Sequence, residues 1–195
     1  MKHFSELSGM AERVVDAAEA LIQQAGYNGF SYDDVAQQVG IRKPSIHHHF
    51  PTKAALVATI VQRYTHRFRE QLLRIEGRRA SAADRLRDYA ALFEATYQQD
   101  RRLCVCGMLG AEAEGLPPKV GAEVQHFFDI NLEWLRQVFA AGQADGSLRA
   151  QALAPAALAE LYLCALEGAM VVGRGAPATH GPAATGRALI SLMAA

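Results

Sequence analysis

A glycine-centred break between two short helical segments, within residues 31–53, constrains the fold more than any other feature of the sequence. Ser31, followed by Asp34 three residues later, resembles a capping box and predicts a short helix that begins here and ends at Gly40. Pro44 suits the first turn of the next helix. A helix, a tight turn with glycine and a second helix form a helix-turn-helix, whose second helix enters the major groove of DNA.

The second helix of this pair combines a small apolar side with a surface of hydrogen-bond donors. The apolar contacts come from Val35, Val39, Ile41 and Ile46. The donors suit base edges and phosphates, and they are Arg42, Lys43, Ser45, His47, His48 and His49. Thr52 is a good N-cap for a long fourth helix, whose first N–H groups can bind phosphate together with Lys53. The alternative is a solvated basic loop on a helical enzyme.

Charge is distributed unevenly along the chain, although the formal net charge is zero. Residues 35–69 contain no Asp or Glu. Residues 1–80 carry 11 Lys and Arg against 8 Asp and Glu, whereas residues 81–195 carry 9 against 12. This asymmetry is typical of a nucleic-acid-binding module joined to another domain. A solvated basic helix surface would give the same count, so charge alone does not decide.

Helical periodicity covers nearly all of the 195 residues and predicts an all-α protein with about nine helices, the first three of which form a small head. The first helix, residues 10–26, carries one apolar stripe, which consists of Met10, Val14, Ala17, Ala18, Leu21 and Ala25. The later helices are predicted at residues 53–77, 81–99, 103–113, 119–141, 155–173 and 183–194. The most apolar stretch, residues 153–172, contains Glu160 and Glu167, so we expect a buried helix and no membrane span.

The stretch from Ala11 to Leu56 resembles the DNA-binding domain of the TetR family of bacterial transcriptional regulators (TetR/AcrR type). The resemblance is carried by the turn at residues 26–30, by Val35-Ala36, Val39-Gly40-Ile41 and Ser45-Ile46, and by the sequence HHFPTK. It implies a helix-turn-helix DNA-binding domain at residues 1–53 and an effector-binding and dimerisation domain at residues 54–195.

The resemblance also implies which residues of the head contact DNA. Base contacts are expected from Arg42, Lys43, Ser45 and His48, and phosphate contacts from His47, His49 and Lys53 with help from Ser31 and Tyr32. Many members have tyrosine at the position of His47. The three consecutive histidines do not suit a metal site, because successive helical side chains diverge by about 100°. We expect neither a metal nor another cofactor.

A single head makes few contacts with DNA, so we expect a homodimer that reads two half-sites of a palindromic operator through a self-complementary surface. The resemblance implies a four-helix bundle made by the last two helices of each subunit. The interface residues expected there are Leu158, Leu161, Ala165, Ala169, Val172, Leu189 and Leu192. The alternative, that both helices are ordinary core, stays open.

Aromatic and sulfur-containing side chains are frequent between the head and these last helices. An apolar cavity with a few polar groups is the usual small-molecule site, and the resemblance implies effector binding among the fourth to eighth helices. The expected contacts are Phe93, Tyr97, Cys104, Met108, Phe127, Trp134 and Tyr162, with polarity from Glu94 or His126. Each of these residues could instead pack in the core.

The sequence therefore predicts a cytoplasmic, non-enzymatic regulator, a repressor that a small-molecule effector releases from its operator. Activation of transcription is an alternative that the sequence does not separate from repression. A second alternative is a regulator that senses oxidants or electrophiles through Cys104 or Cys106. A third is an all-helical cysteine enzyme with His126 as the partner of the nucleophile, for which no local motif argues.

Overall fold

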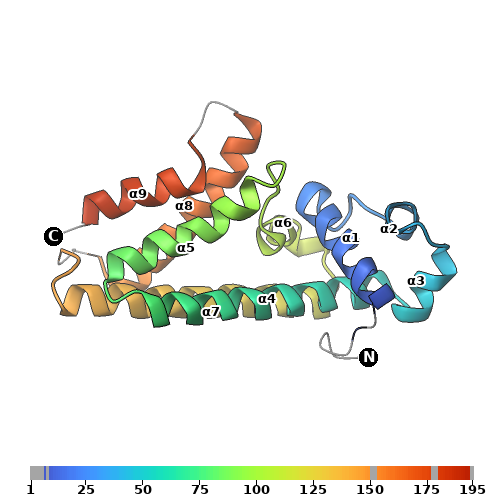
Figure 1. Ribbon diagram of the computed structural model, residues 1–195, viewed down its shortest axis with the longest axis horizontal. Coiled ribbons are helices and arrows are strands. Elements are labelled where there is room, and N and C mark those ends of the chain that lie inside the picture. The colour runs from blue at the N-terminus through green and yellow to red at the C-terminus, as the bar shows by residue number, and fades with distance from the viewer. Residues whose placement is uncertain (1–6, 8, 150–152, 177–179, 194–195) are drawn as a thin grey trace. The chain divides into compact units, whose positions relative to one another are not determined.

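The computed structural model describes residues 7, 9–149, 153–176 and 180–193, and the regular structure in these ranges is helical (Figure 1). Nine α-helices and one 3₁₀ turn cover the described part of the chain, which confirms the all-α prediction. The helices are α1 (Gly9–Ala25), α2 (Tyr32–Val39), α3 (Lys43–His49), α4 (Lys53–Arg78), α5 (Ala82–Tyr97), α6 (Val105–Gly110), α7 (Pro118–Ala144), α8 (Pro155–Gly175) and α9 (Gly181–Met193).

The helix predicted at residues 103–113 is shorter in the structure. It is α6, Val105–Gly110, and the chain then passes into the 3₁₀ turn η2, Ala113–Gly115. Two of the six α6 residues are glycines, Gly107 and Gly110, which disfavour a longer helix.

The chain forms two compact units. The first extends to Arg67 and includes residues 105–127, and the second consists of residues 68–104 together with the chain from Phe128 onward. The helix-turn-helix therefore shares its unit with most of α4, with α6 and with the start of α7. This unit is larger than the domain predicted at residues 1–53, and a functional boundary after Lys53 remains a prediction.

In the first unit, α1 packs against α2, α3 and α6. Val14, Val15, Ala18 and Ile22 are inaccessible to solvent. The predicted apolar stripe was wrong at its end, because Ala25 is exposed. Val15 and Ile22 are buried in addition to the stripe because α6, which is distant in sequence, covers another side of α1.

The ends of α2 match the capping pattern. The Ser31 side chain accepts a hydrogen bond from the Asp34 N–H, and an Asp34 carboxylate oxygen accepts one from the Ser31 N–H at 2.7 Å. At the other end Gly40 has φ 76° and donates its N–H to the Ala36 carbonyl at 2.9 Å. This left-handed conformation turns the chain from α2 towards α3 and is unfavourable for residues that carry a Cβ atom.

In the second unit, α5, α8 and α9 pack against one another (Figure 1). Ser81 caps α5 by accepting a hydrogen bond from the Asp84 N–H at 3.1 Å. A Cβ atom at Gly186 of α9 would lie 2.7 Å from the Ala90 Cβ and 2.8 Å from the Tyr162 hydroxyl. Glycine at this position therefore permits the close approach of the three helices.

The apolar residues of α8 divide between two sides of the helix. Leu158 and Tyr162 are buried in the second unit, whereas Leu161 and Val172 are 48% and 57% exposed. Leu158 was therefore wrongly included among the residues predicted for the dimer interface, because its side chain packs inside its own chain.

By length and composition, α8 is the one described helix that could span a membrane, a test that core helices of soluble proteins also pass.

Replacing Gly40 with alanine is expected to destabilise the protein by about 1 kcal/mol, because the added Cβ makes the left-handed conformation unfavourable. No atom lies within 4 Å of the position that this Cβ would occupy, so a clash would not contribute. The matched control is Gly77→Ala in α4, which also has open space and should be neutral or stabilising. Urea unfolding followed by circular dichroism measures both changes, and equal effects would contradict the assignment.

Candidate nucleic-acid interface and effector site

Helix α3 presents nearly all of its side chains to solvent. Ile46 is its one buried residue. Arg42 occupies the N-cap position without a side-chain capping bond, and Ser45 and His48 are exposed. The structure thus places the side chains expected to contact bases on the outer surface of a short helix, as a recognition helix requires.

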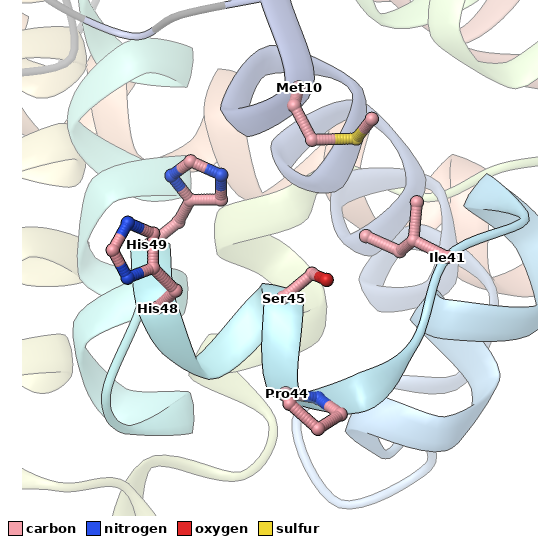
Figure 2. A pocket seen from close by; sticks show the side chains of 6 residues that line it. All are labelled: Met10, Ile41, Pro44, Ser45, His48 and His49. Atoms are coloured by element: carbon pink, nitrogen blue, oxygen red, sulfur yellow. The ribbon is translucent and has the colours of Figure 1, made fainter.

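A hollow of about 460 Å³ lies beside this surface, between the start of α1 and α3 (Figure 2). It is lined by Met10, Ile41, Pro44, Ser45, His48 and His49. Its apolar lining comes from Met10, Ile41 and Pro44, while Ser45 and the two histidines add hydrogen-bonding groups. A surface of this composition can combine apolar contact with a thymine methyl group and hydrogen bonds to neighbouring bases or phosphates.

His47 and Tyr32 contact each other, but only His47 is exposed. Their rings meet edge to face with centroids 4.8 Å apart, and the His47 Nδ1 lies 3.4 Å from the Pro51 carbonyl oxygen. The Tyr32 hydroxyl donates to the Phe50 carbonyl at 2.8 Å, and burial raises the pKa of Tyr32 to about 12. The prediction that the Tyr32 side chain contacts phosphate was therefore wrong, because its hydroxyl already donates a hydrogen bond inside the protein.

Lys53 also points inward in this structure. Its ammonium donates to the Phe30 carbonyl and lies 4.1 Å and 4.7 Å from the ring centres of Phe30 and Tyr27. Burial lowers the pKa of Lys53, and this effect is partly opposed by the carboxylates of Glu112 and Asp34. The neighbouring Thr52 caps α4, because its hydroxyl accepts from the Ala55 N–H at 3.1 Å.

Ion pairs neutralise part of the positive charge of residues 35–69, the stretch that contains no Asp or Glu. Arg63 lies 2.7 Å from an Asp16 oxygen and 2.9 Å from a Glu19 oxygen, and Arg67 also pairs with Glu19. Both acids belong to α1, outside the stretch in which acids are absent. Lys43 pairs with Asp33 at 2.8 Å, although both side chains are largely exposed. Counting charges along the chain therefore overstated the positive charge of this unit.

Glu112, which the sequence did not indicate as a functional residue, stabilises the turn between α1 and α2 through hydrogen bonds. One of its carboxylate oxygens accepts from the Tyr27 N–H at 2.6 Å, and both lie within 3.4 Å of the Asn28 nitrogen. The only indication in the sequence is the pair of acids in "AEAEG", which follows an apolar stretch. The sequence does not show that one of these acids bonds to Tyr27, 85 positions earlier in the chain.

A second candidate site is the aromatic cluster in the interior of the second unit. Tyr89 of α5 is its centre: the Tyr89 ring stacks on Trp134, with centroids 5.4 Å apart and an interplanar angle of 16°. The remaining rings lie within 6.3 Å of Tyr89, and they are Phe68, Phe93 and Tyr162. The Tyr89 hydroxyl donates to the Asn131 side-chain oxygen at 2.8 Å, and the Tyr162 hydroxyl to the Leu86 carbonyl at 2.9 Å.

The structure brings together some, but not all, of the residues expected to bind the effector. Phe93, Trp134 and Tyr162 belong to the aromatic cluster. Tyr97 is half-buried at the end of α5, and Met108 and Phe127 belong to the first unit, where Phe127 contacts Tyr64. Of the expected polar groups, His126 is exposed, and Glu94 accepts the Ala183 N–H at 3.0 Å near the start of α9.

Glu167 of α8 is a further polar group beside this cluster that sequence reasoning did not assign to the site. Burial raises the pKa of the Glu167 carboxyl well above its usual range, and the neighbouring Cys104, to which it is hydrogen-bonded, raises it further. Burial also raises the pKa of Tyr89, with a smaller contribution from Glu167. The signal in the sequence was an acid within an otherwise apolar helix.

The described cysteines form no disulfide. Cys104 and Cys106 are buried and Cys164 is exposed. Within the described residues, no group of three or more His, Cys, Asp or Glu side chains is arranged to hold a metal ion.

Comparison with known proteins agrees with the geometry of α1–α4. Residues 14–60 match the family model described as bacterial regulatory proteins, tetR family. A TetR-family transcriptional regulator from Agrobacterium tumefaciens has the same fold, with a TM-score of 0.87 and 34% identity over 95% of this chain and 98% of that one. A TetR transcriptional regulator from Legionella pneumophila gives 0.85 and 26% over 96% and 99%.

Among curated proteins, one match is to the biofilm operon icaADBC HTH-type negative transcriptional regulator IcaR of Staphylococcus epidermidis. The two are 27% identical over 117 residues, which is 60% of this chain and 60% of the length of IcaR. Together with the Agrobacterium structure and the helix-turn-helix geometry, these matches show that the chain belongs to the TetR family of bacterial transcriptional regulators.

Replacing Lys53 with methionine is expected to destabilise the protein by about 1–2 kcal/mol, because the Phe30 carbonyl loses its donor and two rings lose a cation contact. Lys43→Met is the matched control, since it removes an exposed ion pair that typically contributes less than about 0.5 kcal/mol. Guanidinium unfolding of both variants tests the assignment. If Lys53→Met is as stable as Lys43→Met, the inward contacts of Lys53 have no structural importance.

Proposed function

We propose that this protein is a transcriptional repressor that binds a palindromic operator as a homodimer and is released by a small-molecule effector. The observation that carries the proposal is the exposed donor surface of α3 within the residues that match the family model. Repression in particular is supported by the similarity to IcaR, which is described as a negative regulator. A cytoplasmic location belongs to the same proposal.

The proposed DNA contacts follow the exposure of the head residues. Arg42, Ser45 and His48 are exposed and suit base edges, with Lys43 able to leave its surface pair with Asp33. His47, His49, Ser31, Thr52 and Lys53 are proposed to contact phosphates. For Lys53 this contact requires the ammonium to leave the Phe30 carbonyl, so we expect its part in DNA binding to be smaller than that of Arg42.

The proposed dimer interface is the apolar surface that α8 and α9 leave uncovered. Leu161, Val171, Val172 and Leu192 are 48–73% exposed. Ala165, Ala169 and Leu189 are half-buried and add small or apolar contacts. Exposed apolar patches of this kind mark interaction surfaces, and a two-fold interface would place two copies of α3 on successive major grooves about 34–36 Å apart.

The effector is proposed to act by population shift. Binding in the second unit would favour a conformation in which the two heads are wrongly spaced for the operator. Helix α4 is the proposed lever, because it continues from one compact unit into the other.

Selection of bound fragments from a random duplex library is expected to yield a palindrome whose half-sites are about one helical turn apart. Binding should weaken steeply with salt, because phosphate contacts release counterions. Arg42→Ala should weaken operator binding by about 1–3 kcal/mol, whereas Arg69→Ala, an exposed α4 position outside the head, should have little effect. Recovery of no preferred sequence would overturn the proposal.

The exposed imidazole of His47 is proposed to donate a hydrogen bond to a phosphate. His47→Phe keeps a ring and removes the donor, so it should weaken operator binding roughly 2- to 10-fold. His126→Phe, at an exposed position on α7, is the control and should bind as the wild type does. Fluorescence anisotropy with labelled operator measures these affinities, and equal affinity of wild type and His47→Phe would remove His47 from the phosphate contacts.

A further inference from the structure

The aromatic cluster around Tyr89 has two buried polar atoms for which the protein provides no hydrogen-bond partner. They are the Nε1 of Trp134, which stacks on Tyr89, and the Oε1 of Glu167. Trp134 is only 7% exposed. Buried polar groups in proteins are almost always paired, and an unpaired one is unfavourable. Two such atoms beside one cluster therefore indicate a site that is completed by another molecule.

The other polar groups of the cluster are already engaged. Tyr89 donates to Asn131, and Tyr162 donates to the Leu86 carbonyl. Glu167 is hydrogen-bonded to Cys104, which leaves Oε1 unpaired. The remaining requirements are specific: the indole N–H needs an acceptor or a π-face, and the Glu167 oxygen needs a donor when the carboxyl is ionised.

The charges around the Glu167 carboxyl indicate which class of molecule could pair with it. The groups that act on the Glu167 carboxyl are Cys104, Cys164 and the phenol of Tyr89, and none of them is a cation. A buried carboxylate without a cationic partner is unfavourable, and in this state the carboxyl keeps its proton. A ligand cation would stabilise the ionised form and would also be attracted to the faces of the surrounding aromatic rings.

We propose that this cluster is the effector site and that the effector is an apolar, aromatic-sized molecule carrying a protonated amine, whose ammonium pairs with Glu167. The inference rests on the proposed function and specifies the chemical class of its ligand. The rings of Tyr89 and Trp134 bind the apolar body of the ligand. Insertion of this body between α5, α7 and α8 separates helices that pack together in the second unit.

The pairing links ligand binding to proton release. Without ligand, the pKa of the Glu167 carboxyl is raised well above its usual value. The carboxyl therefore stays protonated at pH values at which an ordinary glutamate is ionised. Pairing with an ammonium lowers this pKa and releases the proton. Affinity for an amine therefore rises with pH until Glu167 is ionised in the free protein, by at most about tenfold per pH unit.

Three compounds with the same body and different head groups test the class: 2-phenylethylamine, 2-phenylethanol and phenylacetate. Trp134 is the single tryptophan of the chain, so its fluorescence reports on the site directly. The amine is expected to change this emission with a Kd at least tenfold below those of the alcohol and the carboxylate, and to weaken operator binding. Equal or tighter binding of the alcohol or the carboxylate, or no binding of any of the three, overturns the proposal.

Glu167→Gln is expected to abolish the preference for the amine and its pH dependence. Glu133→Gln, an exposed α7 acid paired with Arg136, is the matched control and should retain both. If Glu167→Gln does not fold, Trp134→Phe is the second variant, because it keeps a ring and removes the N–H. Calorimetry should then show that this variant binds the amine more weakly than the wild type does but still prefers it to the alcohol and the carboxylate. A preference unchanged in Glu167→Gln, or lost in Trp134→Phe, contradicts the pairing.

The two proposals fail separately. Operator binding without amine recognition would remove the effector assignment and leave the regulator. Loss of all sequence-specific DNA binding in the wild-type protein would remove the proposed function, whatever the tryptophan emission shows.

Discussion

The recognition surface depends on how the short helix α3 is held. With seven residues and one buried side chain, Ile46, this helix cannot orient itself through its own packing. Its position is imposed at both ends, by the left-handed turn at Gly40 and by Phe50, whose carbonyl accepts the Tyr32 hydroxyl. This arrangement is what allows the other side chains of α3 to face solvent, because few of them are needed to hold the helix in place.

The same unit shows why charge along a sequence differs from charge on a surface. Residues 35–69 contain no acids, but Arg63 and Arg67 pair with Glu19 of α1, and Lys53 turns towards the Phe30 carbonyl. On α3, Arg42, Ser45, His47 and His48 remain exposed, and they are among the donors proposed to contact DNA. The proposed interface with DNA therefore depends on specific side chains of α3 more than on the net charge of the unit.

The aromatic cluster of the second unit has the opposite character, because its polar groups are few and buried. Tyr89 connects the aromatic cluster to Asn131, while Trp134 and Glu167 each retain a buried polar atom without a partner. An interior of this kind is costly for stability alone, and ligand recognition gives a physical reason for it. The two proposed sites thus differ in chemistry: exposed donors in one unit for DNA, and desolvated groups among aromatic rings in the other unit for an effector.

The sequence by itself determined the helices, the caps at Ser31 and Thr52, the turn at Gly40 and the outward donors of α3, because these features depend on residues a few positions apart. It also predicted Phe93, Trp134 and Tyr162 as members of one site. Only the tertiary structure decided that Tyr32 and Leu158 are core residues, that Lys53 points inward and that Glu112 holds the turn after α1. It also decided that Glu167 lies beside Cys104 and Tyr89. Each of these depends on a contact between distant segments, and helical periodicity does not specify which segments meet.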